Sequence, residues 1–228
     1  MSNGTTMSND NVNLDTLQSF TPLDGLKREN LTALAKKTQV KKLTAGKLLF
    51  REGDREKMNW FLNTVCTKEW NMEQDAGRTF EEGTQVLLKT YPEYENEIRM
   101  FFDRWEEMLR GEIKDTVLIL NKLKDLNEVK LYALTNWSTE TFPKAKKRLD
   151  FLNSFEGIVV SGEEHTRKPY AKIYEITLNR FNLEPQHCLF IDDSLENIEG
   201  AEKMGINGIH YKSSTQLKEA LQYHNVLP

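Results

Sequence analysis

The chain has 228 residues, of which 29% are charged and 38% are hydrophobic, a balance that is ordinary for a globular protein. Its formal net charge of −4 gives no reason to expect nucleic acid as a partner, because proteins that bind nucleic acid usually present a basic face. No run reaches the roughly 20 apolar residues that a membrane helix needs, so we expect no membrane association.

The first residues, 1–13, are rich in Ser, Asn and Asp and predict a disordered tail without the features of a secretory signal. Residues 14–57 contain a short helical pattern at 28–37 and one apolar strand candidate, Leu48–Phe50. A lone strand is not stable by itself, so this segment looks incomplete. The distant thiols of Cys66 and Cys188 have no metal-ligand spacing and predict two reduced cysteines in a cytoplasmic protein.

Residues 58–112 are predicted to be helical. Thr79 is a candidate N-cap, with Glu81 and Glu82 favourably placed in the first turn. A single helix is expected from about Pro92, because apolar residues recur at helical spacing, namely Ile98, Phe101, Phe102, Trp105, Met108 and Leu109. A further helix is expected at 115–126, with an inward face formed by Val117, Leu118, Leu120, Leu123 and Leu126.

From residue 129 the pattern alternates between apolar strands and helices. The expected strands are 131–134, 158–160, 188–191 and 208–211, and the expected helices are 139–149, 170–181, 195–204 and 214–223. Such alternation predicts an α/β fold with a parallel sheet covered on both faces.

Polar residues follow three of these strands. Thr135 and Asn136 end the first strand, Lys168 lies in the loop after the second, and Asp192 and Asp193 end the third. Taken singly, the threonine and the aspartates could be helix caps, and the lysine could be a solvated surface residue. Ligands of open parallel sheets bind at the carboxyl ends of the strands, so the set together predicts a binding site there.

The segments YALTNW, RKPYAKIYE and LFIDDSLENIEGAEKMGI resemble motifs two, three and four of the haloacid dehalogenase-like (HAD) hydrolase superfamily, in order and at suitable spacing. The helical stretch EWNMEQDAGRTFEEG resembles the helical cap of that family. The resemblance covers about Met58 to Tyr223 and implies a Rossmann-like parallel sheet of the HAD type with an inserted helical cap.

The resemblance also implies roles for the strand-end residues. Thr135 and Lys168 would act in catalysis by binding the phosphoryl oxygens, and Asn136 would help to hold them. Asp192 would be a ligand of Mg²⁺, directly or through water, with Asp193 beside it. The implied activity is a Mg²⁺-dependent phosphomonoesterase acting on a small phosphorylated metabolite. The alternatives are a 2-haloacid dehalogenase-type hydrolase, whose branch tends to lack the carboxylate pair, and a phosphate- or Mg²⁺-binding or regulatory remnant without turnover.

One family motif has no counterpart. The family's aspartate nucleophile should follow an apolar strand before the cap, and a covalent route requires it. Asp15, Asp24 and Asp54 do not follow such a strand, and aligning Leu48–Phe50 with it places Arg51 at the nucleophile position. We therefore expect impaired turnover.

The stretch from Leu17 to Asp54 resembles the start of a cyclic nucleotide-binding domain, ending in FREGD. Its phosphate-binding cassette is missing, so cyclic nucleotide is not expected to bind. The predicted organisation is a tail at 1–13, a truncated cyclic nucleotide-binding-like segment at 14–57, a helical cap at 58–112 and an α/β core lacking its first strand at 113–228. Leu48–Phe50 is predicted to pair between the strands 131–134 and 189–192, as a surrogate for the lost strand. The oligomeric state is not predicted.

Overall fold

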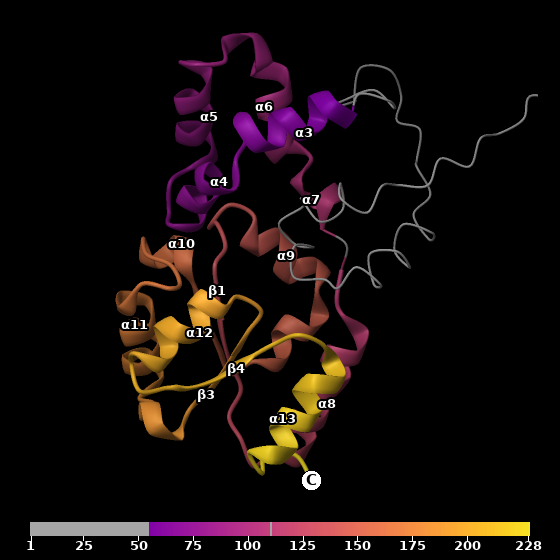
Figure 1. Ribbon diagram of the computed structural model, residues 1–228, viewed down its shortest axis with the longest axis vertical. Coiled ribbons are helices and arrows are strands. Elements are labelled where there is room, and N and C mark those ends of the chain that lie inside the picture. Colours follow the sequence, from indigo (N-terminus) through magenta and orange to yellow (C-terminus); the bar gives the residue numbers. More distant parts are fainter. Residues whose placement is uncertain (1–54, 110) are drawn as a thin grey trace, which may run out of the picture. The chain divides into compact units, whose positions relative to one another are not determined.

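A computed structural model of the chain describes residues 55–109 and 111–228 (Figure 1). Contacts divide the chain into residues 1–59 and 60–228, and helix α3 (Arg55–Thr64) crosses that boundary. The structural statements below concern the second unit. None of the helices in the described ranges is long and apolar enough to cross a membrane.

The helical region after α3 contains five further elements, which are α4 (Lys68–Asp75), α5 (Phe80–Leu88), η1 (Pro92–Tyr94), α6 (Glu95–Asp103) and α7 (Trp105–Met108). Thr79 caps α5 as predicted, through a reciprocal capping box with Glu82. The prediction of one continuous helix from Pro92 is wrong. Arg104 has φ −110° and ψ 15°, which interrupts the helical path between α6 and α7.

Aromatic packing holds this helical region together. Phe80 stacks on Phe102 with ring centroids 3.7 Å apart, and Trp70 lies against Phe102 at 5.1 Å. The indole Nε1 of Trp70 donates to the carbonyl of Gly83 at 3.0 Å, so the one polar atom of this buried ring is satisfied. The region therefore has a core of its own, which joins α4, α5 and α6.

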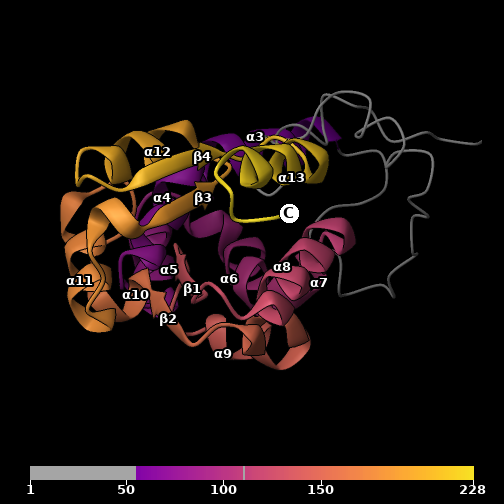
Figure 2. The same ribbon diagram turned by 90° about the horizontal axis from the view of Figure 1, so that it is seen from below.

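Four short strands form two parallel pairs (Figure 2). In the first pair β1 (Tyr132–Thr135) lies beside β2 (Gly157–Val160), and Thr135 is opposite Val160. In the second pair β3 (Leu189–Asp192) lies beside β4 (Asn207–His210), and Asp192 is opposite His210. Each strand falls within one residue of its predicted position at either end. The parallel α/β architecture is thus confirmed.

Helices cover both faces of the strands. The elements are α8 (Lys114–Leu126), α9 (Phe142–Arg148), η2 (Asp150–Ser154), α10 (Ser161–Glu164), α11 (Ala171–Phe181), η3 (Pro185–His187), α12 (Leu195–Glu202) and α13 (Ser214–Tyr223). Successive strand residues face opposite sides. Accordingly, Val159 packs with buried residues of α11 and Val160 with those of α9.

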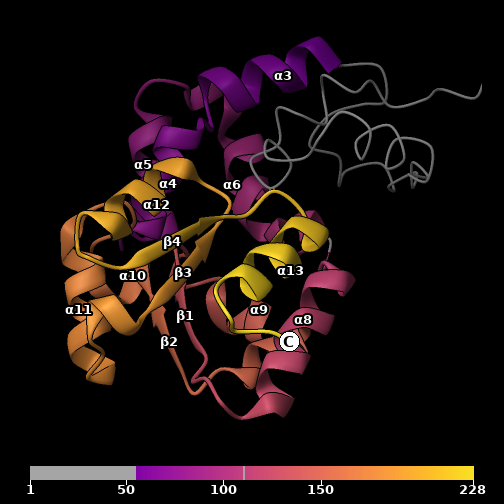
Figure 3. The same ribbon diagram turned by 60° about the horizontal axis from the view of Figure 1, so that its bottom comes forward.

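The predicted inward face of α8 is partly wrong. Leu118 is 59% exposed, whereas Ile119 is 8% exposed and packs with Leu123 against α13 (Figure 3). The helix is rich in leucine on several sides, so apolar content alone did not fix its rotation. The observed face follows the spacing of four that places residues on one side of a helix.

No strand of the described ranges pairs with both β1 and β3, and the two strand pairs share no backbone ladder there. This arrangement agrees with a core in which the central strand is not among the described residues. The predicted surrogate, Leu48–Phe50, and the neighbouring Arg51 lie outside those residues, so that prediction is untested.

The capping box of α5 supports a test of helical-region stability. Thr79→Ala removes the side-chain acceptor for the Glu82 amide, and we expect the free energy of unfolding to fall by about 1 kcal/mol. Thr79→Ser keeps a hydroxyl and should cost only a fraction of that. Urea unfolding measures both. Equal stability of the two variants would contradict the capping role.

Candidate functional site

The strand-end site is centred on an ion pair between Lys168 and Asp192. The Lys168 Nζ atom lies 2.6 Å from Asp192 Oδ2, and the two side chains are only 9% and 7% exposed. The same Nζ atom donates to the carbonyl oxygen of Leu134 at 2.8 Å. Lys168 therefore connects the carboxyl ends of β1 and β3, which share no backbone hydrogen bonds in the part that the structure describes.

Asn136 fixes the backbone of that lysine. Its Oδ1 accepts from the Lys168 backbone N–H at 2.9 Å, and its Nδ2 donates to the Lys168 carbonyl at 3.1 Å. Arg167 Nη1 also donates to this carbonyl, at 3.2 Å. An amide that pairs with both backbone groups of one residue holds it in one orientation, so Asn136 positions Lys168.

The second oxygen of Asp192 is held by the loop and helix that follow it. Asp192 Oδ1 accepts from the backbone N–H of Ser194 and from Nδ2 of Asn197, both at 2.9 Å. Asn197 in turn accepts at its backbone carbonyl from the hydroxyl of Tyr174, at 2.6 Å. Burial raises the pKa of Tyr174, and the negative charge of Asp192 raises it further, so this hydroxyl stays protonated and donates.

Thr135 supplies a hydroxyl at the same edge. Its neighbour Leu134 accepts from Lys168, whereas the Thr135 hydroxyl has no hydrogen-bond partner within the described ranges. An ammonium group has three N–H donors, and two of those on Lys168 are directed to Leu134 and Asp192. Within the described ranges the Thr135 hydroxyl and the third N–H of Lys168 are therefore both without a hydrogen-bond partner, and Lys168 bonds to the residue before Thr135. They are suited to bind an anionic oxygen.

The predicted residues are therefore brought together, with Asp193 following directly after Asp192. The carbonyl of Asp193 lies 3.0 Å from His210 Nε2, across the β3–β4 pair.

Sequence reasoning missed Ser161, which links this edge to the helical region. Ser161 is fully buried and follows the last residue of β2. Its hydroxyl donates to the carbonyl of Asp75, the last residue of α4, at 2.5 Å and accepts from the backbone N–H of Trp137 at 2.9 Å. A second link is made by Glu140, whose Oε2 accepts from the Phe80 backbone N–H at 2.7 Å. The usable signal was that Ser161 directly follows the predicted strand 158–160, as Thr135 follows its own.

Asp75 is itself unusual. Its side chain is partly buried, and its carboxylate makes no hydrogen bond in the described part of the chain. Burial raises the pKa of the Asp75 carboxyl to about 6, and the nearby positive charge of Arg167 opposes that rise. Sequence reasoning gave no signal for it, because an aspartate that ends a helix is common.

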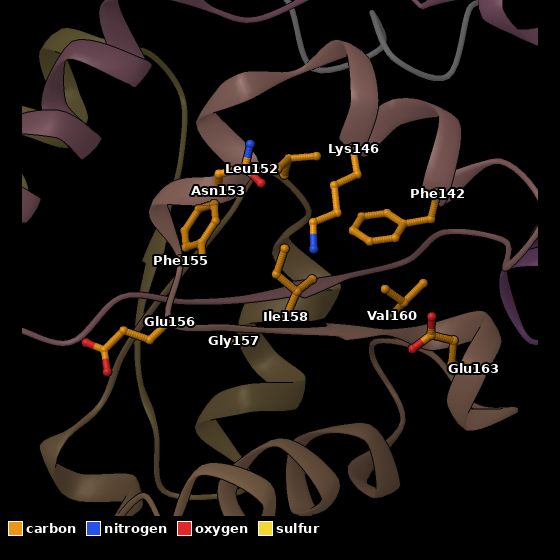
Figure 4. A pocket seen from close by; sticks show the side chains of 10 residues that line it. All are labelled: Phe142, Lys146, Leu152, Asn153, Phe155, Glu156, Gly157, Ile158, Val160 and Glu163. Carbon is orange, nitrogen blue, oxygen red and sulfur yellow. The ribbon is translucent and has the colours of Figure 1, made fainter.

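Two pockets of the described region lie away from these residues. One of about 340 Å³ lies over β2 and is lined mainly by residues of α9, η2 and β2, among them Phe142, Lys146, Leu152, Phe155, Ile158 and Val160 (Figure 4). Another, of about 450 Å³, is lined by residues that include Phe80, Arg99 and Glu140. Neither includes Lys168 or Asp192. We favour the strand-end residues as the site because their polar groups converge on one buried ion pair.

The hydrogen bonds of Asp192 show how the site fits Mg²⁺. A carboxylate has about four lone-pair positions, and three on Asp192 already accept from Lys168, Ser194 and Asn197. The described residues contain no cluster of three or more His, Cys, Asp or Glu side chains that could hold a metal ion. Magnesium commonly binds to only one or two carboxylates and completes its shell with water and substrate phosphate. One lone-pair position of Asp192 is left for such an ion, and Asp193 follows it directly in the sequence.

Comparison with known proteins agrees with this geometry. A family model described as a haloacid dehalogenase-like hydrolase matches residues 19–205, well over half of the chain. The matched range begins inside the segment 14–57, for which the sequence predicted a different origin.

Two curated relatives are phosphatases. The sesquiterpene phosphatase astK of Aspergillus oryzae is 31% identical over 119 residues, which are 52% of this chain and 60% of that protein. The glyceraldehyde 3-phosphate phosphatase of Pyrococcus furiosus is 30% identical over 77 residues, 33% of this chain and 32% of that protein. The chain therefore spans less than two thirds of the length of these relatives.

A solved structure shares the fold. The HAD family enzyme from Bacteroides thetaiotaomicron, an alanine variant in complex with magnesium and inorganic phosphate, has a TM-score of 0.52 and 19% sequence identity. The likeness covers 63% of this chain and 73% of that one.

The raised pKa of Asp75 predicts a pH-dependent cost in stability. In the unfolded chain this carboxyl ionises near pH ~4, so stability is lost as the pH rises from about 4 to about 6 and the full cost applies above that window. Asp75→Asn should therefore raise the free energy of unfolding by about 2 kcal/mol at pH 7.5 and change it little at pH 4.

Urea unfolding at the two pH values measures this difference. Glu69→Gln removes an exposed acid from the same helix and serves as the control, with no comparable change expected. An equal effect of Asp75→Asn at both pH values would contradict the burial of an ionised carboxylate.

Proposed function

Because the chain belongs to the haloacid dehalogenase-like hydrolases, we propose that its strand-end site is that of a Mg²⁺-dependent phosphomonoesterase for small phosphorylated metabolites. The observation that carries this proposal is the ammonium group of Lys168, held between Leu134 and Asp192 at the end of the strand that carries the free hydroxyl of Thr135. In this proposal residues 58–112 form the cap and residues 113–228 form the core lacking its first strand.

Lys168 and Thr135 would bind the oxygens of the phosphoryl group. The third N–H of the Lys168 ammonium and the Thr135 hydroxyl would both donate, and the ammonium group stays in place without rearrangement because Asn136 and Asp192 fix the lysine. Preorganised donors of this kind stabilise the charge that develops on a phosphoryl group during transfer. Asn136 acts through Lys168 and is a positioning residue.

Asp192 and Asp193 would hold Mg²⁺. When bound, the ion neutralises charge on the phosphoryl oxygens. The fold neighbour from Bacteroides thetaiotaomicron was crystallised with magnesium and inorganic phosphate, the two ligands that this proposal requires. The two curated relatives are named as phosphatases, which supports phosphate ester hydrolysis over dehalogenation. Their names indicate leaving groups of different polarity, so the relatives alone do not choose the substrate.

Turnover by this chain is proposed to be slow. No strand of the residues at 55–109 and 111–228 lies between β1 and β3, so none of them supplies a carboxylate at the position of a nucleophile. The donors that bind phosphate do not depend on that strand. Binding and turnover are therefore separable here. A protein that binds phosphate with Mg²⁺ and does not hydrolyse its ester would be a binding module.

The first prediction concerns hydrolysis. Purified protein with Mg²⁺ should hydrolyse p-nitrophenyl phosphate with a kcat far below the typical enzyme value of ~10 s⁻¹, because no described residue supplies the attacking carboxylate. A steady-state assay with and without Mg²⁺ measures this rate. A kcat in the ordinary range that is abolished by Asp192→Asn would show that another residue of the chain attacks.

The second prediction concerns binding. Thr135→Val keeps the volume of the side chain and removes its hydroxyl, so the affinity for inorganic phosphate in the presence of Mg²⁺ should fall about tenfold. Thr135→Ser restores a hydroxyl and should bind nearly as well as the unchanged chain. Isothermal titration calorimetry gives both affinities. An affinity for phosphate that neither substitution changes would show that phosphate does not bind at Thr135.

A further inference from the structure

The end of α4 is linked through Ser161 to the loop that follows β1. The carbonyl of Asp75 accepts from the Ser161 hydroxyl, and Ser161 also accepts from the backbone of Trp137, next to Asn136. Gly77 lies so close to the core that an added Cβ would stand 2.9 Å from the carbonyl oxygen of Gly162. The turn after α4 is therefore fixed against the same loops that carry the phosphate-binding groups.

The contacts of the Asp75 side chain among the described residues do not explain why this position carries an acid. Ser161 bonds the backbone of Asp75, and the carboxylate oxygens accept no hydrogen bond in the described ranges. Its charged neighbour is Arg167, which immediately precedes Lys168. Arg167 lies over the ring of Tyr170, 5.1 Å from the ring centroid, and donates one N–H to the Lys168 carbonyl. A guanidinium group has five N–H donors, so most of those on Arg167 are free.

An unsatisfied, partly buried carboxylate is destabilising, and groups with such a cost are concentrated at functional sites. Burial accounts for the raised pKa of Asp75, which at about 6 still leaves the group ionised at neutral pH. The carboxylate of Asp75 is thus close enough to Arg167 for their charges to interact, and Arg167 directly precedes Lys168 of the proposed phosphate site. Their natural complement is a group that donates and accepts hydrogen bonds at once.

We propose that Asp75 and Arg167 recognise the leaving group of the substrate and select phosphomonoesters that carry hydroxyl groups close to the phosphate. A hydroxyl donates to Asp75 and accepts from Arg167. An apolar leaving group would bury both charges without replacing their hydration, and an anionic one would be repelled by Asp75. This inference names the substrate class of the strand-end site and therefore rests on the proposed function.

The test compares two ligands that differ only in their hydroxyls. The chain is titrated with sn-glycerol 3-phosphate, n-propyl phosphate and inorganic phosphate, each with Mg²⁺ at pH 7.5, and calorimetry gives the affinities. Hydrogen bonds to charged groups justify an expected preference of about tenfold for glycerol 3-phosphate over propyl phosphate. Asp75→Ala should lower the affinity for glycerol 3-phosphate about tenfold and the affinity for propyl phosphate less than twofold, which removes the preference.

Two further variants sharpen the comparison. Asp75→Asn keeps one acceptor oxygen without the charge and should retain part of the preference. Glu69→Gln, the exposed control on α4, should leave the preference unchanged. Because binding is measured, slow turnover does not obscure either result.

The outcomes separate this inference from the proposed function. Phosphate binding that depends on Thr135, together with equal affinities for the glycerol and propyl esters, would overturn the role of Asp75 and Arg167 alone. A preference that survives in Asp75→Ala would do the same. Failure of all three ligands to bind would overturn the proposed function and this inference with it.

Discussion

The ion pair between Lys168 and Asp192 is the interaction on which the site depends. Two charges this deeply buried are costly to desolvate, and removing one partner of such a pair typically destabilises a protein by about 3–5 kcal/mol. The geometry offsets this cost, because both oxygens of Asp192 and two donors of Lys168 are hydrogen-bonded. The pair also fixes the relative position of two strands. It joins the end of β1 to the end of β3, two strands that no described backbone ladder connects.

That connection explains how the ends of β1 and β3 are held together although no described backbone ladder joins them. In a continuous sheet the Leu134 carbonyl would accept from a backbone N–H of the next strand, and here the Lys168 ammonium satisfies it. Asn136 then fixes the backbone of the same lysine through both of its amide atoms. The donors for an anion are thus assembled by side chains. A nucleophile, by contrast, would have to be supplied by a strand between β1 and β3, and no described strand lies there.

The strand-end residues could be predicted because the topology of a parallel sheet alone brings them to one edge. Parallel strands bring their carboxyl ends to one edge, so Thr135, Lys168 and Asp192 needed only strand assignments to be placed together. The buried face of a helix and the breaks within helices were harder to predict from the sequence. Because α8 carries apolar residues on several sides, the sequence did not show that Ile119 rather than Leu118 is buried. The residues around Arg104 likewise gave no sign of its non-helical backbone. Ser161 and Asp75 were missed because their roles come from a contact between elements 86 residues apart.

Asp75 shows why such a contact carries functional information. A carboxylate that accepts no hydrogen bond weakens the folded state at neutral pH, and an asparagine of the same shape would avoid most of the cost. Its carbonyl contact with Ser161 needs no particular side chain, so packing gives no reason for an acid at this position. The ion pair of Lys168 and Asp192 is a buried charge that its neighbours satisfy, and it builds the site. Asp75 is a buried charge that they leave unsatisfied, which is the expected state of a group whose partner arrives with the ligand.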